Sequence, residues 1–119
     1  MKHLCHAMML AILASPLRAH EPDILGVQID KSGGSATVTV TLLHPDTGWD
    51  HYADGWEVLD AQGNRLGYRL LHHPHVEEQP FTRSLNALIL PEGIEEIFVR
   101  AHCSVDGWSS TPFRVALQP

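Results

Sequence analysis

The chain has 119 residues, the size of one domain, and its 44% hydrophobic and 18% charged residues are typical of a folded globular protein rather than a disordered or membrane-spanning one. Its 8 basic and 14 acidic residues give a formal net charge of -6, which argues against a nucleic-acid-binding surface because such a surface needs a basic patch. Nine histidines outnumber all lysines and arginines together, and their placement is the main functional signal of the sequence.

Residues 1–19 have the features of a secretory signal peptide. Lys2 precedes an apolar run of 11 residues from Leu4 to Ala14, and the small residue Ala19 ends the segment. The run is too short to span a bilayer, so we expect no membrane span in the mature chain. Cleavage after Ala19 would leave residues 20–119 as one mature domain in the periplasm or outside the cell.

The predicted mature chain contains seven histidines and a single cysteine, Cys103. Cys5 would be removed with the signal peptide, so an internal disulfide cannot form and the domain depends on its hydrophobic core. An odd cysteine in an oxidising compartment serves as a metal ligand, a reactive thiol or a buried apolar residue. The sequence leaves these three roles open.

Alternating apolar residues predict a series of short strands. In residues 36–42, alanine, valine and leucine alternate with threonine, which is the period of a half-buried β-strand. No stretch has a helical period. The predicted strands are residues 25–29, 36–42, Trp56 up to a turn at 62–64, 65–72, 81–90, 97–103 and 113–117.

Seven short strands in 100 residues predict an all-β domain built as an antiparallel β-sandwich. Residues 85–93 and the strand that follows are similar to the second half of fibronectin type III and immunoglobulin-like domains, although the corner tyrosine of those domains is absent. The resemblance implies an immunoglobulin-like, fibronectin type III-like sandwich of about seven strands. It also places Trp56 in the core, where such domains carry a tryptophan on the third strand.

The connections between strands divide between two ends of such a sandwich. If consecutive strands run antiparallel, the short turns at 31–35, 62–64 and 91–93 fall at one end, and none contains histidine. The other end holds the longer segments, and every histidine of the mature chain lies in or beside one of them. We name this end the histidine pole; its segments are residues 20–23, 44–55, 73–80 and 104–110.

The histidine pole has the donor atoms of a transition-metal site, because imidazole, carboxylate and thiolate groups bind zinc, copper and iron when three or four of them converge. His73 and His75 are two residues apart, so extended backbone would project both to one side. If cleavage follows Ala19, His20 would offer its α-amine and its imidazole to copper. Copper and zinc are the expected metals, with iron a weaker alternative. The candidate ligands are His20, His44, His51, His73, His75, Cys103 and Asp106.

Two segments resemble a family of small, exported, functionally uncharacterised bacterial proteins. They are residues 49–58, WDHYADGWEV, and residues 73–85, HPHVEEQPFTRSL. The resemblance covers nearly the whole mature chain and implies export and a sandwich, without an activity. The family carries a Ser-Val-His-Gly-aromatic string where this chain has Asp106, so one imidazole of a shared site is missing here.

A second resemblance is to the iron-site segments of superoxide reductases, which also have an immunoglobulin-like fold. His44 before Pro45, His51 before an aromatic residue, and Cys103 with Asp106 three residues later are similar to those segments. The resemblance implies a mononuclear iron held by His44, His51 and Cys103. Asp106 replaces the last histidine, and this change of ligand would alter the charge and redox potential of such a centre.

The alternative to a metal site is a protein-interaction module. In that reading the loop histidines hydrogen-bond the backbone, and the long loops form a pH-sensitive surface for a protein partner. Arg83 would pair with Glu77 or Glu78 as a solvated contact. The sequence contains no nucleophile elbow, phosphate loop or Cys-x-x-Cys motif, so we expect a non-enzymatic protein. The oligomeric state is left open.

Overall fold

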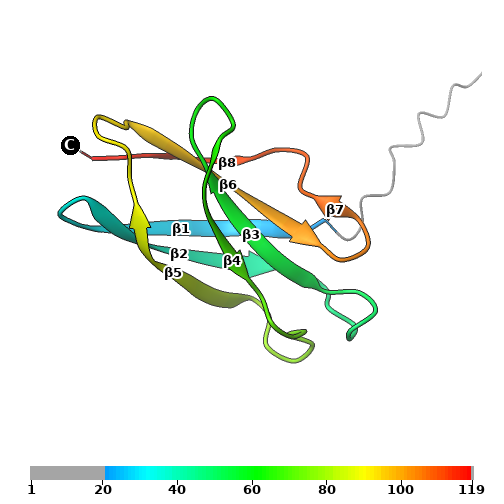
Figure 1. The fold of residues 1–119 in the computed structure, drawn as a ribbon. Coiled ribbons are helices and arrows are strands. Elements are labelled where there is room, and N and C mark those ends of the chain that lie inside the picture. The colour runs from blue at the N-terminus through cyan, green and yellow to red at the C-terminus, as the bar shows by residue number, and fades with distance from the viewer. Residues whose placement is uncertain (1–20, 119) are drawn as a thin grey trace, which may run out of the picture.

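The computed structural model describes residues 21–118, so the predicted signal peptide and His20 lie outside the described residues. The described part is all-β, with no helix, and forms two antiparallel sheets (Figure 1). It contains eight strands: β1 (Asp23–Ser32), β2 (Ser35–Leu43), β3 (Ala53–Leu59), β4 (Arg65–Leu70), β5 (Phe81–Ile89), β6 (Glu96–Cys103), β7 (Gly107–Trp108) and β8 (Phe113–Ala116). Within this range, no helix has the length and hydropathy of a membrane-crossing segment.

The first sheet has the strand order β1-β2-β5. The alternation predicted for β2 is confirmed, because its alanine, valines and Leu42 are buried while its threonines lie on the partly exposed face. Two hydroxyl pairs, Thr39 with Ser84 and Thr41 with Thr82, join β2 to β5 across that face at 2.8 Å. This pairing holds the end of β2, and therefore His44, beside β5.

The second sheet has the order β4-β3-β6, and both β7 and β8 pair with the remaining edge of β6. Trp56 on β3 is fully buried, which confirms its predicted place in the core. Every second residue of β6, ending at Cys103, is fully buried as well. Antiparallel pairing sets Ala53 opposite Cys103, so the start of β3 and the end of β6 meet at one end of the sheet.

The structure contains one strand, β7, that is not among the seven strands predicted from the sequence. It has two residues, too few to show a period in the sequence. It forms because Gly107 adopts φ 79°, a left-handed conformation that turns the chain back so that Trp108 pairs with His102. The turn holds Asp106 close to the end of β6.

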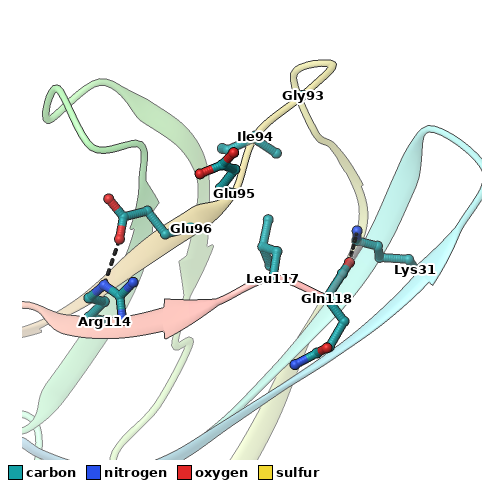
Figure 2. Close-up of a pocket in the computed structure, with 8 residues that line it drawn as sticks. All are labelled: Lys31, Gly93, Ile94, Glu95, Glu96, Arg114, Leu117 and Gln118. Carbon is teal, nitrogen blue, oxygen red and sulfur yellow. Dashed lines mark hydrogen bonds and ion pairs between the residues drawn. The ribbon is translucent and has the colours of Figure 1, made fainter.

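The long and short connections lie at opposite ends of the molecule (Figure 1). The segments between β2 and β3, between β4 and β5, and between β6 and β7 lie at one end, which is the described part of the histidine pole. The opposite end carries the pocket of Figure 2. In this pocket the Lys31 amine donates to the Gln118 backbone carbonyl at 2.7 Å, and Arg114 pairs with Glu96 at 2.5 Å. No histidine lines that pocket.

Candidate metal centre

Three potential ligands from distant parts of the chain converge at the histidine pole. His44 follows β2, His51 precedes β3, and Cys103 is the last residue of β6. One nitrogen of each imidazole and the Cys103 sulfur all lie within 4.8 Å of one another. His44 and Cys103 are fully buried, while the His51 side chain keeps 16% of its surface exposed. We name these three residues the His2Cys cluster.

The first imidazole of the cluster is oriented by a buried carboxylate. Nδ1 of His44 donates to Oδ1 of Asp46 at 2.5 Å, and both side chains have no exposed surface. Nε2 of His44 is buried and has no hydrogen-bond partner within residues 21–118. An imidazole that donates one N–H to a carboxylate and leaves its other nitrogen bare has the arrangement usual for metal-bound histidine. The residues present therefore fit a metal ion.

Asp46 also connects three segments of the histidine pole. Oδ1 accepts the backbone N–H of Ala53 at 2.9 Å, and Oδ2 accepts the backbone N–H of His75 at 2.8 Å. A buried carboxylate needs such partners, because an unpaired charge in the interior is very costly. Asp46 thus fixes the loop after β2 against the start of β3 and the loop before β5.

Backbone hydrogen bonds hold the second imidazole near Cys103. The Thr47 N–H donates to the His51 carbonyl at 3.0 Å, and the His51 N–H donates to the Gly48 carbonyl at 3.2 Å, which closes a small loop. The next residue, Tyr52, exchanges hydrogen bonds with Ser104: its N–H donates to the serine hydroxyl at 3.0 Å and its carbonyl accepts the serine N–H at 2.9 Å. The His51 ring meets the His44 ring edge to face, with centroids 5.1 Å apart.

Asp106 lies at the rim of the His2Cys cluster and offers a fourth donor. Its Oδ2 is 3.5 Å from Nε2 of His51, and it accepts the Cys103 thiol at 3.6 Å. The Asp106 side chain is 38% exposed, so this side of the cluster faces solvent. Burial raises the pKa of the Cys103 thiol, and the Asp106 charge acts in the same direction. The metal-free thiol is therefore protonated at neutral pH.

The remaining predicted ligands do not join this cluster. His75 is buried, but its ring stacks on Phe81 with centroids 4.0 Å apart, and its nearest imidazole is that of exposed His73, at 4.8 Å. His20 lies outside the described residues.

Two residues beside the histidine pole form local contacts. His102 is on the outer face of the second sheet, where Nδ1 contacts Oδ1 of Asp54 at 2.5 Å. Arg83 pairs with Glu78 at 2.9 Å, as predicted.

The sequence placed Asp46 at the histidine pole without a role for it. The spacing of His44 and Asp46, two residues apart, could have indicated this role. The Asp46 N–H donates to the His44 carbonyl at 2.8 Å, and the resulting tight turn brings the carboxylate back to the imidazole. Two nitrogens, one sulfur and one carboxylate oxygen form a mixed donor set that suits zinc, iron or copper. The described residues thus contain a possible His/Cys metal site, open to solvent on the Asp106 side.

Comparison with known proteins gives a sequence relative and two structural likenesses. A putative lipoprotein of Halomicrobium mukohataei is 41% identical over 95 residues, which are 79% of this chain and 46% of the relative, so the chain spans about half the length of that protein. No family model matches the chain.

Among solved structures, a hypothetical protein from Pyrococcus horikoshii OT3 aligns with a TM-score of 0.49, and a superoxide reductase in the oxidised state aligns with a TM-score of 0.48. Each alignment covers 83% of this chain and 88% of the other at 17% identity.

Proposed function

We propose that this chain is an exported protein that binds one divalent transition-metal ion through His44, His51 and Cys103, with Asp106 as the fourth ligand. The observation that carries the proposal is the His44 imidazole, whose bare, fully buried Nε2 is set by the bond from Nδ1 to Asp46. A buried polar nitrogen without a partner is costly, and a metal ion at that nitrogen removes the cost.

Zinc is the metal that the donor set favours. Zn²⁺ has no geometric preference of its own and accepts imidazole, thiolate and carboxylate ligands together, most often four in a tetrahedron. The His51 side chain is 16% exposed and that of Asp106 is 38% exposed, so both reach the solvent-facing side of the cluster. Copper is the chief competitor, because Cu²⁺ binds nitrogen and sulfur sites more tightly than Zn²⁺ does.

Iron is the second candidate. The three residues whose segments resemble the superoxide reductase iron site are the three of the His2Cys cluster. Carboxylate in place of an imidazole would change the potential of such a centre. An Fe³⁺ form with a Cys103 thiolate ligand would have a visible charge-transfer band that Cys103→Ser abolishes. Absence of the band in iron-loaded wild-type protein would eliminate this candidate.

Export and the finer fold class belong to the same proposal. The signal-like residues 1–19 support export, and so does the name of the Halomicrobium relative, a putative lipoprotein. The strand orders β1-β2-β5 and β4-β3-β6-β8 support a fibronectin type III-like sandwich, because in constant-type immunoglobulin domains the fourth strand joins the first sheet instead.

The test is the metal content of protein matured by its native export route. We expect one equivalent of divalent metal in the purified wild type. Cys103→Ser and His44→Ala should bind the ion too weakly to retain it through purification, whereas His72→Ala, which removes an exposed histidine outside the cluster, should retain it. Added Zn²⁺ at 100 times its Kd should stabilise the wild type by about 2.7 kcal/mol. Wild type that retains no zinc, copper or iron, and whose melting temperature added metal does not raise, would favour a protein-interaction module instead.

A further inference from the structure

His75 is a buried histidine whose surroundings within the described residues leave it incomplete. It is 5% exposed, and both ring nitrogens are buried without a hydrogen-bond partner there. A neutral imidazole has one N–H to donate and one lone pair to be satisfied, and each group left without a partner in the interior is destabilising. Packing on Phe81 explains why the ring lies here, but it leaves the nitrogens unsatisfied.

Hydrogen bonds to the backbone N–H and carbonyl of His75 fix the position of its ring. The His75 N–H donates to Oδ2 of Asp46 at 2.8 Å, and the His75 carbonyl accepts Nε2 of Gln79 at 2.8 Å. Oε1 of the same Gln79 accepts the N–H of His44 at 3.0 Å. These bonds leave the ring little freedom, so a ligand that uses its nitrogens meets a preorganised partner.

A second imidazole lies beside this one. The His73 ring centroid is 4.8 Å from that of His75, and the two rings are inclined by 41°. Nδ1 of His73 lies 3.2 Å from the Pro74 carbonyl and can donate to it, which leaves Nε2 as the lone-pair nitrogen. His73 is exposed, so its ring can turn towards an ion held at His75 without disturbing the core.

Within residues 21–118, the charged groups near His75 offer no third ligand. Asp46 already accepts three hydrogen bonds, and Glu78 is paired with Arg83 at 2.9 Å. Zn²⁺ needs three or four protein ligands, so two imidazoles do not suit it. Cu⁺ is a d¹⁰ ion that accepts two nitrogen donors in a line. Two neutral imidazoles also leave the ionic charge uncompensated, and the solvation cost of burial rises with the square of that charge, which favours a monovalent ion.

We propose that His73 and His75 form a second metal site, separate from the His2Cys cluster, that takes Cu⁺ between one nitrogen of each imidazole. The proposal does not depend on the identity of the metal in the first site. It uses residues that the first site leaves aside, and it gives the His-Pro-His segment a role in handling monovalent copper.

The experiment titrates Cu⁺ anaerobically into the mature chain against bicinchoninate, a coloured Cu⁺ chelator. Cys103→Ser serves as the background, because it removes the thiol that would otherwise bind Cu⁺ in the first cluster. We expect this background protein to retain one Cu⁺ with two nitrogen neighbours in its X-ray absorption spectrum. Adding His73→Ala should weaken binding on the order of 100-fold. Adding His72→Ala instead, the matched exposed neighbour, should change it by less than about twofold.

A second variant guards against an indirect effect on folding. His75→Phe keeps an aromatic ring against Phe81 and should lose Cu⁺ while its circular dichroism stays that of the parent. Absence of Cu⁺ binding in the Cys103→Ser background overturns the proposal, and so does equal binding by the His73→Ala and His72→Ala chains, since water would then satisfy His75. Zn²⁺ binding by the His73→Ala chain with Cys103 intact tests the first site alone, so the two sites fail or stand separately.

Discussion

Nδ1 of His44 lies 2.5 Å from Oδ1 of Asp46 in a place where neither side chain has any exposed surface. The bond fixes the imidazole as the tautomer whose Nε2 carries the lone pair, and only that tautomer can offer Nε2 to a metal. The same carboxylate holds the backbone of Ala53 and of His75. Asp46 therefore links the ligand set of the first site to the fixed ring of the second.

Asp46→Asn should weaken Zn²⁺ binding by about 10- to 100-fold, the usual cost of losing a carboxylate behind a metal-bound histidine. Asparagine has one acceptor oxygen for three donors, so we also expect about 1–3 kcal/mol of lost stability. Competition with a coloured zinc chelator, below the melting temperature of the variant, measures the affinity. Asp50→Asn, in the exposed part of the same loop, is the control. Equal affinities for the two variants would remove Asp46 from the proposed role.

Strand alternation and parity were sufficient to predict much of this molecule. The alternation of apolar residues predicted β2 and β6, because each strand has one face against a single core. Because consecutive strands run antiparallel, every second connection falls at the same end, which predicted where the long connections lie. Two of the three roles left open for Cys103, core residue and metal ligand, are compatible in this fold. Cys103 points into the core as the last residue of β6, at the end where His44 and His51 arrive.

The grouping of the histidines could not be derived from sequence spacing. His73 and His75 are two residues apart, which predicts that extended backbone projects both side chains to one side. Instead, Asp46 binds the His75 backbone and Phe81 receives its ring, so only His73 remains exposed. These are contacts between segments far apart in the chain, and no local period encodes them.

The turn between β3 and β4 should make the stability of the domain depend on acid pH. Backbone and side-chain hydrogen bonds from Asn64 hold the pKa of Asp60 below its ordinary value. The contribution is fully present above the unfolded pKa of about 3.9, and it is lost as the pH falls through the lower folded pKa. Carboxyl NMR titration of Asp60 measures the shift.

Asn64→Ala provides the matched variant for that titration, because it removes the side-chain bond and keeps the larger backbone contribution. The pKa of Asp60 should rise in this variant but stay below its ordinary value. The pH dependence of unfolding below about pH 4 should become shallower in Asp60→Asn. A pKa for Asp60 at its ordinary value in the wild type would contradict the assignment.

On the outer face of the second sheet, the two arginines that pair with Glu57 should contribute unequally to the free energy of unfolding. Its side chain is 3% exposed and accepts from Arg65 and from Arg100, each at 2.9 Å. The Arg100 side chain is 32% exposed and that of Arg65 51%, and Arg100 lies closer to the Trp108 ring, at 4.7 Å against 5.7 Å. Arg100→Met should cost about 2–4 kcal/mol, because Glu57 is left with a more solvated partner.

Arg65→Met is the comparison and should cost about 0–1 kcal/mol, as for an exposed ion pair. Urea unfolding of both variants, with equal m-values, gives the two losses of stability. Equal losses would mean that burial of the partner does not govern this network.

Metal binding at the His2Cys cluster should release a proton from Cys103. Burial raises the pKa of this thiol, so it is protonated in the metal-free chain at neutral pH, whereas the ligand form is the thiolate. Each unit of pH below the thiol pKa should then lower the Zn²⁺ affinity about tenfold more in the wild type than in Cys103→Ser. Calorimetry in buffers of different ionisation enthalpy counts the protons released. A wild-type chain that releases no more protons than Cys103→Ser on taking up zinc would place the ion away from the sulfur.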